Sequence, residues 1–274
     1  MALTSDKAAY KIFDAKGNET SYNKLFNDAK KADIVMFGEL HDNPICHWLE
    51  LELTKDLYND KKENLVLGAE MFEADNQVSL DEYLKGYIKE NGFKENARLW
   101  PNYITDYSPL VEFAKTSKIP FIATNIPRRY ASIVASKGLE FLDSIITTEA
   151  RKWVAPLPIP FDSTLKCYKD LINGSMGMGH SGINIAKAQA IKDATMAYFI
   201  LKNYRRGKTF MHYNGAYHSN NGSGIVMYLK YSDLHLKILS ISSVEQSQIS
   251  TLDKESMGLA DYTICTPEDM TKTR

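Results

Sequence analysis

Four side chains that can move protons or ligate metals follow one apolar run. In the stretch "IVMFGELHDNPICHW", residues 34–48, the end of a predicted strand is followed closely by Glu39, His41, Asp42 and His47. Imidazole and carboxylate groups can share acid and base roles, and they can also ligate a divalent metal. A carboxylate behind an imidazole can fix its tautomer. The spacing therefore predicts a site for acid–base or metal chemistry at the end of this strand.

The pattern glycine, two residues, histidine ends a second predicted strand as well. It occurs at Gly38–His41 and at Gly215–His218, and Glu70 ends a third strand. In an open parallel sheet, ligands bind at the carboxyl ends of the strands, so these residues are predicted to share one edge. One such motif arises often by chance, and a single histidine at a strand end is more often structural. The prediction therefore depends on the matching pair.

The chemistry of this edge favours a metal site. His41, Glu70 and His218 together offer two imidazoles and a carboxylate, which suit a divalent metal ion. In a metal-dependent hydrolase, Glu39 would act as general base on a metal-bound water. The predicted catalytic residues of such an enzyme are Glu39, His41, Glu70 and His218.

Other polar side chains are candidates for the same site. Asp193 lies four residues after Gln189 on a predicted helix, so an acid there could support a histidine of the site. Arg128 could clamp a carboxylate, although a solvated helix start explains it slightly better. Met178 and His180 stand in a glycine-rich stretch that could form an apolar lid or a methionine-rich loop packed on the core.

Alternating strands and helices predict an α/β fold with a mostly parallel central sheet flanked by helices. We expect a single domain over residues 1–274, with a helical insertion or lid at about 140–182, where the alternation breaks. The predicted strands are 33–39, 64–72, 119–125, 208–215, 236–242 and 261–266. The predicted helices are 44–59, 78–90, 108–117, 128–136 and 183–204.

Composition excludes several classes of protein. The chain has 274 residues, 44% of them hydrophobic, which is enough for a normal core. Its formal net charge of −1 gives no electrostatic support for binding nucleic acid. No apolar run is long enough to cross a membrane. The first residues, "MALTSDKAAYKIFDAKG", lack the features of a signal peptide, so they fit either a cytoplasmic start or a mature chain whose signal segment is removed.

Several stretches taken together resemble the ChaN-like haem-binding proteins, which belong to a wider group with the Tiki proteins, the TraB proteins and the erythromycin esterases. The resemblance spans residues of about 33 to 230. It is carried by "FGELHDNPICHWLELELTKDL", "LGAEMFEADNQVSLDEYL", "WPNYITDYSPLVEFAK", "PFIATNIPR", "GHSGI", "AQAIKDATMAYFI" and "NGAYHSNNGSGI".

This resemblance implies a haem-binding protein of the bacterial cell envelope, usually a lipoprotein, that serves haem or iron uptake. It also implies a homodimer that holds paired haems between two protomers, with a tyrosine on the iron. A membrane link would come only through an N-terminal lipid anchor that this sequence does not contain. The tyrosines nearest the matched stretches are Tyr103, Tyr107, Tyr168 and Tyr217.

The haem-binding residues expected from the motifs and the resemblance form one set: His41, His47, Arg128, Met178, His180, Asp193, Tyr217 and His218. One residue departs from the family pattern. Tyr217 is bulky where relatives tend to have a small polar residue before the histidine, so it would either ligate iron or narrow the pocket.

Three functions therefore remain open. The first, which the resemblance favours, is haem binding in the cell envelope with a haem-linked homodimer. The second, which the residues alone favour, is a metal-dependent hydrolase whose cofactor is a divalent metal ion rather than haem. The third is an interaction protein with a vestigial site. Haem needs a wide apolar slot, whereas a hydrolase needs a compact polar cleft with an open metal position.

Overall fold

The strand that precedes the first histidine shows why the sheet is buried on both faces. Ile34 and Met36 pack into one hydrophobic cluster, while Val35 and Phe37 pack into another on the opposite face. The whole strand is buried, which explains why its sequence is apolar without alternation. This description rests on a computed structural model that covers residues 7–174 and 182–273.

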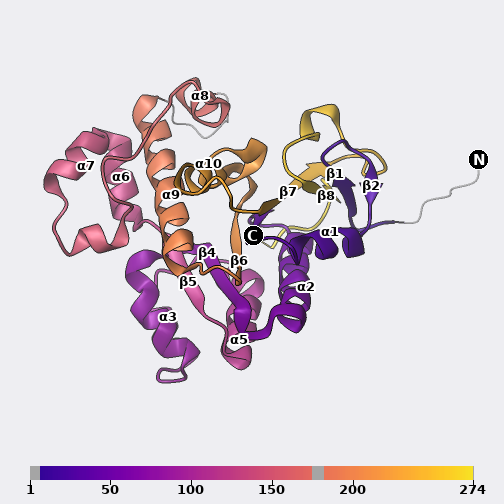
Figure 1. Cartoon of the computed structure of the whole chain (residues 1–274), viewed down its shortest axis with the longest axis horizontal. Helices are drawn as coiled ribbons and strands as arrows, with labels where there is room; N and C mark the ends of the chain where they lie inside the picture. Colours follow the sequence, from indigo (N-terminus) through magenta and orange to yellow (C-terminus); the bar gives the residue numbers. More distant parts are fainter. Residues whose placement is uncertain (1–6, 175–181, 274) are drawn as a thin grey trace, which may run out of the picture.

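The strands form one sheet in the order β2-β1-β8-β7-β3-β6-β4-β5 (Figure 1). All neighbours from β8 to β5 are parallel, whereas β1 pairs antiparallel with both β2 and β8. The bounds are β1 (Lys11–Asp14), β2 (Glu19–Thr20), β3 (Ile34–Glu39), β4 (Leu65–Glu73), β5 (Phe121–Asn125), β6 (Thr209–Gly215), β7 (Ile238–Gln246) and β8 (Tyr262–Pro267). The predicted α/β fold with a mostly parallel sheet is confirmed, but the short hairpin β1–β2 was not predicted.

Helices cover both faces of this sheet. Side chains of α1, α2, α3 and α5 join the cluster on one face, and those of α9 and α10 join the cluster on the other (Figure 1). The bounds are α1 (Tyr22–Ala29), α2 (Pro44–Lys61), α3 (Gln77–Leu84), α4 (Glu90–Asn96), α5 (Ser108–Ser117), α6 (Arg128–Lys137), α7 (Leu139–Ile145), α8 (Lys166–Ile172), α9 (Ile183–Asn203) and α10 (Ile225–Ser232).

One predicted helix is in fact two. The expected helix over 78–90 ends as α3 at Leu84, and α4 begins only at Glu90. The chain turns between them, where the N–H of Gly86 donates to the carbonyl of Tyr83 at 3.0 Å. Apolar periodicity continues across this turn, so periodicity alone does not show the break.

The described part of the predicted insertion contains short helices joined by irregular segments. It contains α7, a short 3₁₀ turn at Ala150–Trp153 and α8, and α7 packs with α6 and α9 beside the sheet (Figure 1). Met178 and His180, for which either a lid or a methionine-rich loop was predicted, lie in 175–181, outside the described residues. Among the helices that the structure describes, none combines the length and the apolar character needed to cross a bilayer.

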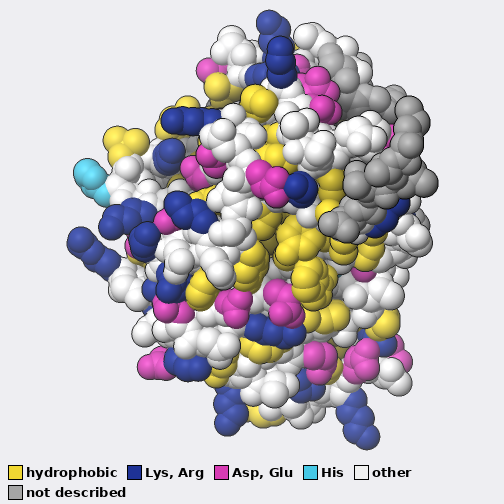
Figure 2. Space-filling model, turned by 90° about the vertical axis from the view of Figure 1, so that its right-hand side faces the viewer, with side chains coloured by type: hydrophobic (Ala, Val, Ile, Leu, Met, Phe, Trp, Pro, Cys, Tyr) yellow, Lys and Arg dark blue, Asp and Glu magenta, His cyan; other side chains and the backbone are white. Residues whose placement is uncertain are grey.

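The surface carries both signs of charge. On the face shown in Figure 2, hydrophobic side chains gather in the middle, and acidic and basic side chains are interspersed around them. No extended patch of one sign dominates this face, as expected for a chain with a net charge of −1.

Candidate functional site

The first glycine–histidine turn is held by close backbone packing and by a helix cap. A Cβ at Gly38 would lie 2.8 Å from both the Cα of Ala216 and the carbonyl oxygen of Ile241, so only glycine fits between these segments. Asn43 then caps α2, with its side chain accepting from the N–H of Ile45 at 3.0 Å. Together these contacts fix the turn that carries Glu39, His41 and Asp42.

Glu39 is buried and orients His41. The imidazole Nδ1 of His41 donates to Glu39 Oε1 at 2.6 Å, and the hydroxyl of Tyr107 donates to the same oxygen at 2.8 Å. Burial alone would lower the pKa of His41, but the hydrogen bond to Glu39 and the charge of Glu70 raise it. The side chain of His41 is 42% exposed, whereas that of Glu39 is fully buried. Glu39 therefore fixes one side of the His41 ring, while the rest of the ring is accessible to solvent.

His47 lies beneath His41 and does not reach the surface. Its Nε2 donates to the carbonyl oxygen of His41 at 3.1 Å, and its Nδ1 lies 3.3 Å from Glu39 Oε2 and 3.2 Å from Glu50 Oε2. Burial and the neighbouring charge of Glu39 raise the pKa of Glu50 well above its ordinary value. His47 is thus placed to support the first turn rather than to meet a ligand in the cleft.

The second glycine–histidine turn carries a buried ion-pair network. His218 Nε2 lies 3.1 Å from Glu70 Oε1, and His218 Nδ1 lies 2.5 Å from Asp193 Oδ1. Asp193 also accepts from the hydroxyl of Tyr168 at 3.1 Å. Burial alone would lower the pKa of His218, but the charges of Glu70 and Asp193 raise it to about 10. His218 therefore lies between two buried carboxyl groups that favour its charged form.

The two turns meet at Gly215. Its N–H donates to Glu70 Oε2 at 2.8 Å. A Cβ at this position would lie 2.7 Å from His41 Nε2 and 3.6 Å from Glu70 Oε2. Glycine thus leaves a small space onto which an imidazole nitrogen and a carboxylate oxygen converge. The three residues predicted to bind metal, His41, Glu70 and His218, are neighbours around this point.

A cavity of about 270 Å³ opens beside Glu70. The ring of Trp100 stands edge-on to His41, with 4.8 Å between the ring centroids. Arg128 at the start of α6 and Lys192 on α9 give the cavity two cations. Its lining consists of Glu70, Glu73, Trp100, Asn125, Ile126, Arg128 and Lys192. The arrangement suits a ligand with a flat apolar part and anionic groups.

The tyrosines expected as iron ligands do not face this cavity. Tyr103, Tyr107 and Tyr168 are buried, and the last two donate to Glu39 and Asp193. Tyr217 is half-buried, and its hydroxyl donates to the carbonyl oxygen of Cys167 in α8 at 3.0 Å. Burial raises the pKa of Tyr217 to about 12. In this arrangement each of these hydroxyls stays protonated and directed into the protein.

Sequence reasoning missed several residues that complete the site. Glu50 follows His47 by three residues, so the helical spacing could have revealed it. Trp100 and Lys192 lie far along the chain from both histidine turns, and only the packed structure brings them to the cavity.

Comparison with solved structures shows a fold shared with haem-binding and hydrolytic proteins. The structure of ChaN of Campylobacter jejuni, described as showing cofacial haem binding, is 18% identical with a TM-score of 0.70, and the match covers 95% of this chain and 98% of ChaN. An erythromycin esterase EreC variant in an open conformation is 12% identical with a TM-score of 0.50, covering 95% of this chain and 83% of that one. A Bacillus cereus protein is also 12% identical with a TM-score of 0.50, covering 92% of this chain and 80% of that one.

The family is identified by its sequence model. The model described as "Haem-binding uptake, Tiki superfamily, ChaN" matches residues 25–229, and the chain belongs to this ChaN-like haem-binding family. A search of curated proteins gave no match.

Proposed function

We propose that this protein binds haem at the carboxyl edge of its sheet, on the side opened by His41. The observation that carries this proposal is His41 itself, which is 42% exposed while its Nδ1 is fixed by the buried Glu39. A histidine held by a carboxylate and presenting its other nitrogen is a common arrangement at metal centres. Membership of a haem-binding family supports haem as the group that it meets.

The residues around the cavity fit the parts of a haem. Trp100 and Ile126 offer apolar surface for the porphyrin, and Arg128 and Lys192 offer cations for its propionates. When bound, haem would supply an iron centre, and His41 is the residue here that would hold it. The space at Gly215, onto which His41 Nε2 points, suits an approach on this side.

We further propose that haem is shared between two copies of the chain. The cavity of about 270 Å³ is smaller than a typical enclosed ligand pocket of about 300–1,000 Å³, so a haem would remain open on one side. A second protomer with its own haem would cover that side. This arrangement agrees with the cofacial haem described for Campylobacter ChaN. A role in haem or iron uptake at the cell envelope, with attachment through a lipid anchor, completes the proposal.

The competing function is a metal-dependent hydrolase. The observation in its favour is the same space at Gly215, because His41 Nε2 and Glu70 Oε2 converge there. Glu70 is already occupied by the N–H of Gly215 and by His218, however, and His218 is held by Asp193. A metal ion would have to displace or share these contacts, so we rank this function second.

Hemin titration with sedimentation on the same samples tests the proposal. We expect a saturable Soret shift and haem-dependent dimers for the natural sequence. His41→Ala should weaken hemin binding by at least about tenfold. His235→Ala is the matched control, because His235 is exposed and lies outside the site, and it should leave binding unchanged. Equal binding by both variants, or no saturable binding at all, would contradict the proposal and direct attention to metal-dependent hydrolysis.

A further inference from the structure

A second cluster of ligating groups lies beneath His41, separate from the cavity. Glu39, His47 and Glu50 each present one atom to it, and these atoms all lie within 4.8 Å of one another. Glu39 reaches the cluster from β3, and the other two reach it from the first turns of α2. All three side chains are at least 95% buried.

Each carboxyl group of the cluster has one oxygen without a hydrogen-bond partner. Glu39 Oε1 is satisfied by His41 and Tyr107, but Glu39 Oε2 accepts no hydrogen bond. Glu50 Oε1 also has no hydrogen-bond partner. Buried carboxylate oxygens are normally paired, because removing a charge from water without compensation is costly. A divalent cation between these carboxyl groups would give both oxygens a partner, in place of the proton that burial and Glu39 favour on Glu50.

The orientation of His47 strengthens this conclusion. Its Nε2 faces the carbonyl oxygen of His41 at 3.1 Å and Asp106 Oδ2 at 3.5 Å, and both of these atoms can only accept, so Nε2 carries a proton. In neutral His47 the lone pair of Nδ1 then faces Glu39 Oε2 and Glu50 Oε2. His47 Nδ1, Glu39 Oε2 and Glu50 Oε2 thus face one another at one buried point, and a cation there would give all three atoms a shared partner.

We propose that Glu39, His47 and Glu50 form a binding site for one divalent metal ion, distinct from the haem cavity. Ligand atoms about 2.1 Å from a metal at tetrahedral or octahedral angles lie about 3.0–3.4 Å apart. The separations of 3.3 and 3.2 Å from His47 Nδ1 to the two carboxylates agree with that geometry. One imidazole and two carboxylates suit zinc, manganese or ferrous iron.

The metal would act on the haem site through Glu39. The Oε2 atom of Glu39 faces the metal cluster, while its Oε1 atom accepts from His41. A cation on Oε2 would fix this carboxylate and hence the ring of His41. The role of the metal ion would be to position His41, because neither His47 nor Glu50 reaches the cavity.

Cobalt titration of the chelator-treated full chain, without hemin, tests this site. Visible ligand-field bands report binding, and elemental analysis counts the metal. We expect one Co²⁺ per chain and at least a tenfold loss of affinity in Glu50→Gln. Glu52→Gln is the matched control on the same helix, because Glu52 pairs with Lys55 at the surface. His218→Gln tests whether metal binds at the other histidine turn instead, and it should retain the site.

The proposal is overturned if the natural sequence binds no stoichiometric Co²⁺, if Glu50→Gln binds as tightly as the natural sequence, or if only His218→Gln loses binding. Nitrogen-15 spectra of labelled histidine keep the test valid should Glu50→Gln fold poorly. With Zn²⁺ added to the natural sequence, we expect His47 Nδ1 to show the shift of a metal ligand while Nε2 stays protonated. A doubly protonated His47 in the presence of Zn²⁺ would overturn the site.

Discussion

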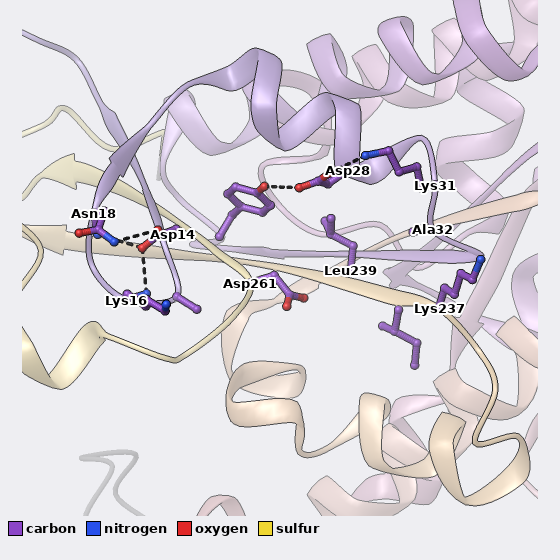
Figure 3. Close-up of a pocket in the computed structure, with 12 residues that line it drawn as sticks. Asp14, Lys16, Asn18, Asp28, Lys31, Ala32, Lys237, Leu239 and Asp261 are labelled. Atoms are coloured by element: carbon purple, nitrogen blue, oxygen red, sulfur yellow. Dashed lines mark hydrogen bonds and ion pairs between the residues drawn. The ribbon is translucent and has the colours of Figure 1, made fainter.

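The two edges of the central sheet each carry a charged cavity, but the charges are held differently. The amino edge has a cavity of about 590 Å³ between the β1–β2 turn, the end of α1 and the starts of β7 and β8 (Figure 3). Its acids, Asp14, Asp28 and Asp261, accept ordinary hydrogen bonds from neighbours, and Lys31 pairs with Asp28 while remaining 73% exposed. The carboxyl-edge cavity beside Glu70 is smaller, about 270 Å³, but His218, Glu70 and Asp193 at that edge are buried.

This difference shows that burial of charge, rather than cavity size, marks the edge suited to chemistry. At the carboxyl edge, His218 lies between Glu70 and Asp193, and the charges of these two acids raise the pKa of His218 to about 10. At the amino edge, solvent screens the ion pair of Lys31 and Asp28. The amino-edge cavity therefore offers a ligand little beyond space and exposed charge.

The largest expected effect comes from breaking one ion pair at each edge. His218→Ala leaves Glu70 and Asp193 buried without their partner, and should lower the free energy of unfolding by about 3–5 kcal/mol. Lys31→Ala removes an exposed pair and should lower it by less than about 1 kcal/mol. Urea denaturation of both variants measures the difference. Similar losses at the two edges would refute the contrast.

A second test compares the two glycines that begin the histidine turns. An added Cβ at Gly38 meets backbone atoms of Ala216 and Ile241, which cannot move aside, so Gly38→Ala should lower the free energy of unfolding by about 1–3 kcal/mol. Gly215→Ala meets the ring end of His41, which can rotate, and should cost less stability but weaken hemin binding. In denaturation Gly38→Ala should therefore show the larger loss of stability, and in hemin titration Gly215→Ala should show the larger loss of affinity.

The pH dependence of stability should reveal the ion pair of Glu70 and His218. The pKa of His218 rises from its ordinary 6.5 to about 10, so its stabilisation is complete below about pH 6.5 and is lost as pH rises toward 10. Burial alone would raise the pKa of Glu70, but the charge and hydrogen bond of His218 lower it below its ordinary 4.5. The stabilisation by Glu70 is therefore present above pH 4.5 and is lost on acidification below it.

Denaturation of the natural sequence and of His218→Gln from pH 4 to 10.5 checks this expectation. The difference in unfolding free energy between them should be largest at about pH 5–6.5 and shrink toward both ends. A difference that grows above pH 8 would show that His218 is neutral in the folded protein.

The smallest effects are expected at the rim of the carboxyl-edge cavity. Arg128 is exposed and Lys192 half-buried, so each contact with a haem propionate is partly screened. Arg128→Met and Lys192→Met should each weaken hemin binding by up to about fivefold, equivalent to about 1 kcal/mol. Lys237→Met at the amino edge is the control and should leave affinity unchanged. Raising the salt concentration should reduce the difference between variants and natural sequence.

The carboxyl edge could be predicted because its main residues follow strands directly. The apolar runs predicted the strands β3, β4 and β6. Parallel pairing of these strands brings His41, Glu70 and His218 to one edge of the sheet, whatever the conformation of the loops. The role of Asp193 as support for a histidine was also readable from the helix that carries it.

Other features depend on packing between distant segments, which local periodicity does not encode. Trp100 reaches His41 from a loop that has no strand or helix signal of its own. The exposure of His41 and the burial of His218 also cannot be read from two identical motifs, because the segments packed over them differ. The hairpin β1–β2 escaped prediction because its strands span only four and two residues.

Hydrogen exchange with and without hemin tests the central claim most directly, because it locates the ligand on the fold. We predict that hemin slows exchange in the turns after β3, β5 and β6, at residues 40–47, 125–130 and 215–220. Exchange at the amino edge, at residues 14–18 and 237–240, should stay unchanged. Protection confined to the amino edge, or spread evenly over both edges, would contradict the assignment of haem binding to the edge that carries His41.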